Sequence, residues 1–210
     1  IYSQSGTNNK FESYFKKGAK LSQQNQYYDI DFDFYQITKD FLNESRIGVF
    51  VNFIKEIQNL GESGLDVIKA VLQYDCTKYN SMLIEKLETA QNILNKDKES
   101  SLYQLQILAQ SFAKLTERES VNEVIAQITS SEGQIELYNV IVDFTIENDL
   151  KEESRFYLQK MVTLIESLKD EKERMEWRIK LKTLSNKAGD DKLNSEIKMV
   201  FQSKDIYGVS

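Results

Sequence analysis

The stretch GQIELYNVIVDFTIENDLKEESRFYLQKMVTLIESL, residues 133–168, decides the fold. Apolar residues recur at helical spacing on both sides of a short polar break, Glu147-Asn148-Asp149. A helix with such a stripe buries it against a neighbour, and a break of three residues keeps two helices antiparallel. The stretch therefore predicts a helical hairpin.

Similar amphipathic stretches occur before and after this hairpin. They cover residues 46–60, 65–72, 79–94, 102–115, 121–128, 172–187 and 193–201. In the second half of the chain, first helices are predicted to start near Leu102, Gln134 and Lys172, which gives a period of about 35 residues and thus the length of a helix-turn-helix repeat. Since a two-helix unit cannot bury its apolar stripes alone, we expect the hairpins to stack.

The spacing over Leu102–Gln202 resembles that of the tetratricopeptide-repeat (TPR) family. Ala109, Ala113 and Ala126 can serve as the small residues of the helix crossing, but the family's proline is missing, since the chain has none. The resemblance implies an all-α chain of antiparallel hairpins stacked as an α-solenoid. The alternative is an irregular all-α bundle.

The expected organisation has four parts. They are a flexible tail at 1–10, an N-terminal helical region of divergent hairpins or a cap at 11–98, TPR-like hairpins at 99–203 and a C-terminal tail at 204–210. The N-terminal region includes an aromatic segment from Phe11 to Asn43 that also fits a strand at Asp29–Phe34. Its acidic spacing matches a calcium loop in part, but Phe34 replaces the required glycine, so we expect no metal site.

The composition disfavours catalysis. The chain has no histidine and a single cysteine, Cys76, which excludes imidazole bases, Ser-His-Asp and Cys-His pairs and thiolate metal clusters. It also lacks the glycine-rich phosphate-binding motifs, and no pair of carboxylates stands out. We therefore expect no enzyme and no cofactor, and we expect Cys76 to be a small buried side chain.

Charge and hydropathy limit the partners. The formal net charge is −6, with 13 basic and 10 acidic residues at 151–204 against 14 and 23 elsewhere. An acidic chain repels nucleic acids, so we expect none as a partner. No apolar run is long enough to enter a membrane. The chain begins with Ile1, so a cytoplasmic protein and a processed, exported or surface-tethered form both fit the sequence, which does not indicate the oligomeric state.

One helix carries the candidate binding residues. Arg174, Arg178 and Lys182 recur every four residues and form one ridge beside Trp177. By the TPR resemblance this is a first helix that lines the concave groove, so the ridge and Trp177 are expected to bind an acidic partner segment. The alternative is a solvated helix face, neutralised by acidic residues such as Glu152 and Glu153, with Trp177 as a packing residue.

Two functions follow as hypotheses. The first is a non-catalytic, protein- or peptide-binding adaptor of the helical-repeat type. The second is a structural subunit of a larger assembly, or an exported or surface interaction protein. A groove binder should expose aromatic and basic side chains on one face, whereas an assembly subunit should expose an apolar edge.

Overall fold

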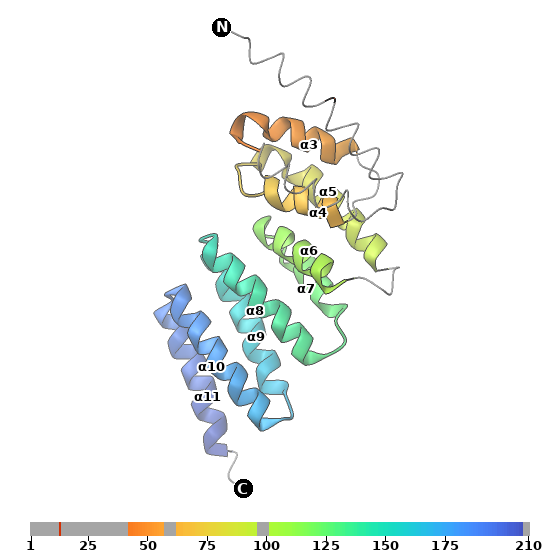
Figure 1. Ribbon diagram of the computed structural model, residues 1–210. Helices are drawn as coiled ribbons and strands as arrows, with labels where there is room; N and C mark the ends of the chain where they lie inside the picture. Colours follow the sequence, from red (N-terminus) through yellow and green to blue (C-terminus); the bar gives the residue numbers. More distant parts are fainter. Residues whose placement is uncertain (1–12, 14–41, 57–61, 96–100, 208–210) are drawn as a thin grey trace. The chain divides into compact units, whose positions relative to one another are not determined.

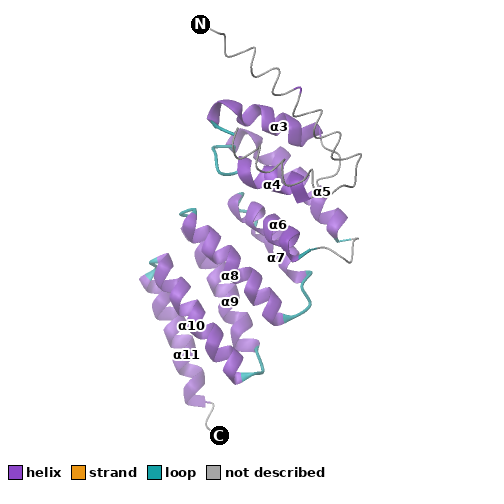
Figure 2. Cartoon of the chain, in the orientation of Figure 1, coloured by secondary structure: helices purple, strands orange, loops and turns teal. Residues whose placement is uncertain are grey.

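The structure is a computed structural model that describes residues 42–56, 62–95 and 101–207, together with Ser13. The predicted tail at 1–10, nearly all of the aromatic segment and the partial calcium-loop pattern lie outside the described residues. All the elements within the described ranges are helices, and Figure 2 shows no strand there. The prediction of an all-α chain is confirmed for this part, and both the solenoid and the irregular bundle are compatible with it.

The chain divides into two compact units, Ile1–Ser100 and Ser101–Ser210. The described elements of the first unit are the 3₁₀ turns η1 (Glu44–Arg46) and η2 (Thr77–Tyr79) and the helices α3 (Ile47–Glu56), α4 (Glu62–Val71) and α5 (Asn80–Leu94). The helix α3 packs against both α4 and α5. Their core consists of large apolar side chains, among them Phe50, Ile54, Leu65, Ile68, Leu83 and Leu87.

Cys76 belongs to this core, as predicted. It is buried, its thiol donates a hydrogen bond to the Val71 carbonyl oxygen at 3.0 Å, and burial raises the pKa of the thiol. The helix α4 begins at Glu62, three residues before the start of the predicted stretch at 65–72.

The second unit consists of six helices within the described residues. They are α6 (Leu102–Lys114), α7 (Arg118–Ala126), α8 (Ser131–Glu147), α9 (Lys151–Ser167), α10 (Glu171–Ala188) and α11 (Asp191–Tyr207). Each successive pair forms a hairpin, and α6 packs against α8, which packs against α10 (Figure 1). The first helices of the three hairpins therefore lie next to one another, which positions the candidate site.

Local sequence signals fix where these helices begin and end. Ser101, Ser130 and Asp170 each accept a hydrogen bond from a backbone N–H in the first turn of α6, α8 and α10. Gly189 ends α10 in the left-handed conformation, with φ of 68°. The cap at Ser130 places the start of α8 three residues before the predicted Gln134, and the predicted tail from Lys204 is helical as far as Tyr207.

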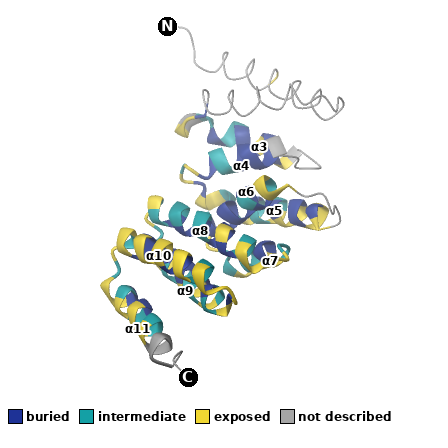
Figure 3. Ribbon diagram, turned by 60° about the horizontal axis from the view of Figure 1, so that its bottom comes forward, coloured by how far each residue is buried: buried dark blue, intermediate teal, exposed yellow. Residues whose placement is uncertain are grey.

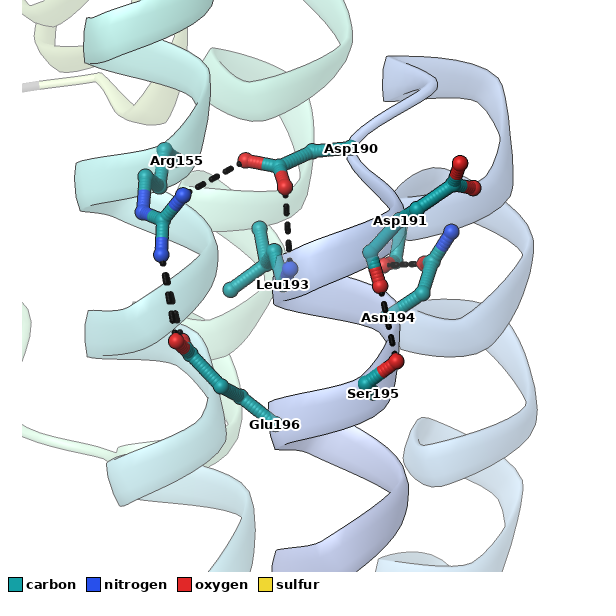
Figure 4. Close-up of polar contacts among 8 residues, drawn as sticks. Arg155, Asp190, Asp191, Leu193, Asn194, Ser195 and Glu196 are labelled. Carbon is teal, nitrogen blue, oxygen red and sulfur yellow. Dashed lines mark hydrogen bonds and ion pairs between the residues drawn. The ribbon is translucent and has the colours of Figure 1, made fainter.

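Ion pairs join neighbouring hairpins. Arg118 of α7 binds Glu153 of α9 through both carboxylate oxygens, with the shortest distance 2.8 Å. In Figure 4, Arg155 of α9 reaches Asp190 at 2.9 Å and Glu196 of α11 at 3.3 Å, while Asp190 also accepts the Leu193 N–H. These contacts hold successive second helices in register.

Candidate functional site

Arg178, at the centre of the predicted basic ridge, is buried. Only 8% of the residue is exposed, and its guanidinium donates to both carboxylate oxygens of Glu166 on α9 at 2.9 Å. The same group lies over the ring of Phe201 on α11, at 4.8 Å from its centroid. Arg178 thus connects three helices, and its charge already has a buried partner.

The other two basic residues of the ridge have different environments. Arg174 is partly buried and donates to the carbonyl oxygen of Leu168, the C-cap residue that follows α9, at 2.9 Å. Lys182 is exposed and forms no ion pair within the part of the chain that the structure describes. The expected ridge is therefore not one exposed surface, and a role of these residues in partner binding stays a prediction.

The acidic residues proposed to neutralise this helix are also placed differently. Glu153 is buried and binds Arg118, and its neighbour Glu152 is exposed. The carboxylate that neutralises Arg178 is Glu166, in the last turn of α9. This corrects the expectation that Glu152 and Glu153 supply the counter-charge.

Trp177 and the ridge residues have different surroundings. It is 5% exposed, it contributes to a groove of about 320 Å³, and the ammonium of Lys180 lies 3.9 Å from the centroid of its ring. The groove crosses the first helices of all three hairpins. Its lining residues are Leu102 and Gln106 from α6, Glu136, Leu137, Asn139 and Val140 from α8, and Trp177 and Lys180 from α10.

The groove combines apolar surface with polar groups. Leu102 is 56% exposed, whereas Leu137 is buried. Glu136 and Lys180 bring one charge of each sign, and Figure 3 shows exposed residues along α10. Within the described ranges the indole N–H of Trp177 donates no hydrogen bond. This mixture suits an apolar side chain with polar groups beside it.

A larger hollow, of about 550 Å³, lies beside the turns that follow α8 and α10. Its basic side chains are already paired, since Arg155 binds Asp190, Lys151 lies 3.7 Å from Asp149, and Lys187 binds Asp143 and Glu147. The hydrogen bond to Asp143 raises the pKa of Lys187. A ligand there would have to replace these pairs, so we favour the smaller groove as the candidate site.

The described residues contain no group of three or more His, Cys, Asp or Glu side chains that could hold a metal ion. The same part of the chain has no helix with the length and apolar character needed to cross a membrane. Comparisons with protein-family models, with curated proteins and with solved structures each found no match. The TPR resemblance therefore stays a prediction that rests on spacing.

Sequence reasoning identified one helix of the site but not the groove. Residues 102, 137 and 177 are far apart in the chain and meet only because three first helices pack side by side. The usable signal was the exposed apolar start of α6, where Leu102 follows a capping box at Ser101 instead of a polar first turn. The i, i+4 ridge was a weaker guide, because it cannot show which side of the helix is covered by α9 and α11.

Proposed function

We propose that this protein is a non-catalytic binding module that holds a peptide segment of another protein in the groove across α6, α8 and α10. The observation that carries the proposal is the groove itself, which is lined by the exposed Leu102 of α6, by residues of α8, and by Trp177 and Lys180 of α10. A volume of about 320 Å³ corresponds to one or two side chains, which is the scale of a linear peptide anchor.

The chemistry of the groove suggests the kind of segment. An aliphatic or aromatic side chain would bury apolar surface against Leu102, Val140 and Trp177. A carboxylate next to this anchor would meet the ammonium of Lys180, which is exposed. We therefore propose an apolar anchor flanked by an acidic residue, which keeps the acidic partner expected from the sequence but assigns its recognition to Lys180.

The only tryptophan of the chain makes the proposal testable by fluorescence. A library of short peptides would be selected on the immobilised protein, and the enriched peptides would be titrated while Trp177 emission is followed. We expect enrichment of sequences with an apolar residue beside an acidic one, and an emission shift on binding because the indole changes its surroundings.

Two substitutions in the groove complete the test. Leu102→Asp removes the exposed apolar side chain without harming α6, because an acidic residue is favourable in the first turn of a helix. Lys180→Glu reverses the charge beside Trp177. Both should weaken binding at least about tenfold, whereas Lys192→Glu on α11 should not. If the unchanged protein and all three variants bound the peptide equally well, the groove would not be the binding site.

A further inference from the structure

The outer edge of α10 carries an exposed apolar patch. Met175 is 48% exposed and Ile179 is 63% exposed, and they lie four residues apart on one side of the helix. Lys182 lies three residues after Ile179, and Asn186 lies four residues after Lys182. Both are on the same side of the helix, and both are exposed. This side lies away from the Trp177 and Leu181 face that packs into the unit.

The preceding repeat shows how the corresponding positions of α8 are placed. Aligned on their buried residues, α8 and α10 correspond with a shift of forty positions, so Ile135 matches Met175, the half-buried Asn139 matches Ile179, and Val142 matches Lys182. Ile135 and Val142 are completely buried in α8, which packs against α10. The outer edge of α10 therefore has the position of a packing surface and is uncovered within the described residues.

The charges beside this patch are self-complementary. Glu176 and Lys182 lie three residues before and three residues after Ile179, on opposite sides of it, and both are exposed. Neither forms an ion pair within the part of the chain that the structure describes. A two-fold axis beside Ile179 would set two α10 helices antiparallel, with Glu176 of each copy level with Lys182 of the other.

We propose that the outer edge of α10 binds the same edge of a second copy of this chain, forming a two-fold symmetric dimer. Ile179 would meet its symmetry mate at the axis, Met175 would pack beside it, and two Glu176–Lys182 pairs would flank this centre. The patch is small, so we expect weak association, with a dissociation constant in the micromolar range or above.

Sedimentation equilibrium of the full chain over a concentration series tests the dimer. The unchanged protein should show a concentration-dependent dimer, and Ile179→Glu should weaken it at least about tenfold because it places two carboxylates at the axis. Lys192→Glu makes the charge more negative on α11 and should leave the dimer unchanged. A protein that stays monomeric at every concentration, or an Ile179→Glu dimer of undiminished strength, would overturn the proposal.

A charge exchange tests the symmetry of the pairing. Glu176→Lys and Lys182→Glu should each weaken the dimer, because each sets like charges opposite one another. The double variant should recover the lost affinity, and an equimolar mixture of the two single variants should form a mixed dimer. If neither the double variant nor the mixture recovers, the two-fold arrangement is wrong. Thermal unfolding followed by circular dichroism would verify that each variant is folded.

Discussion

Arg178 and Glu166 form a buried ion pair, with 9% and 6% of their side chains exposed and two N–O distances of 2.9 Å. The pair joins α10 to the last turn of α9, and Phe201 of α11 covers the guanidinium. A buried charge is costly without its partner, so this pair makes the packing of three helices depend on two side chains.

Removing the charge of Glu166 should therefore destabilise the fold. Glu166→Gln keeps the size of the side chain but leaves the Arg178 charge uncompensated, and we expect a loss of about 3 kcal/mol in the free energy of unfolding, measured by urea denaturation. Lys172→Met, an exposed control in the same helix, should change it by less than about 0.5 kcal/mol.

The double variant Arg178→Met with Glu166→Leu separates charge from packing. Both charges are gone and most of the volume is kept, so the double variant should be more stable than Glu166→Gln. If Glu166→Gln were as stable as the unchanged protein, the ion pair would have no structural role. A loss of binding in an Arg178 variant would then point to direct contact with the partner.

Gly189 gives a second test of the fold. Its φ is 68°, and a Cβ atom added there would meet no atom within 4 Å, so only the backbone conformation opposes a side chain. We expect Gly189→Ala to lower the free energy of unfolding by about 1 kcal/mol, and Gly189→Asn to cost less because asparagine tolerates the left-handed region. If the two substitutions had equal effects, the left-handed conformation at residue 189 would not be the cause of the loss.

Much of the second unit is predictable from sequence, for reasons that Gly189 illustrates. A periodic apolar stripe, polar caps and a terminal glycine fix the ends of a helix locally. The break predicted at 147–149 and the gap left between the stretches 172–187 and 193–201 therefore coincide with the turns after α8 and α10, although Glu147 itself still belongs to α8. The partner of Arg178 was not predictable. Its pairing with Glu166 depends on the angle at which α9 crosses α10, and no local pattern encodes that angle.

Two buried tyrosines of the second unit should make the free energy of unfolding depend on pH in the alkaline range. Burial, followed by the negative charge of Glu153, raises the pKa of Tyr157 far above its ordinary value of 10. Burial also raises the pKa of Tyr138, to about 12. The unfolded chain therefore releases these protons at a lower pH than the folded chain, and the free energy of unfolding should fall as the pH rises above about 10.

Urea denaturation between about pH 9 and pH 11 would measure this slope. Tyr157→Phe cannot ionise, so its stability should fall less steeply with pH than that of the unchanged protein. Tyr138→Phe should act in the same direction with a smaller effect, although it also removes the hydrogen bond to Asn122. Identical slopes for Tyr157→Phe and the unchanged protein would show that Tyr157 is not protected by burial.

The most direct test of the proposed binding groove uses the indole N–H of Trp177, the only one in the chain. Its nuclear magnetic resonance signal would be followed during titration with a selected peptide, together with the methyl signals of Met175 and Ile179 on the outer edge of α10. Binding in the groove predicts that the indole signal shifts and saturates with the peptide while the edge methyls stay unchanged. An unchanged indole signal under saturating peptide, with shifts at Met175 and Ile179 instead, would contradict the account.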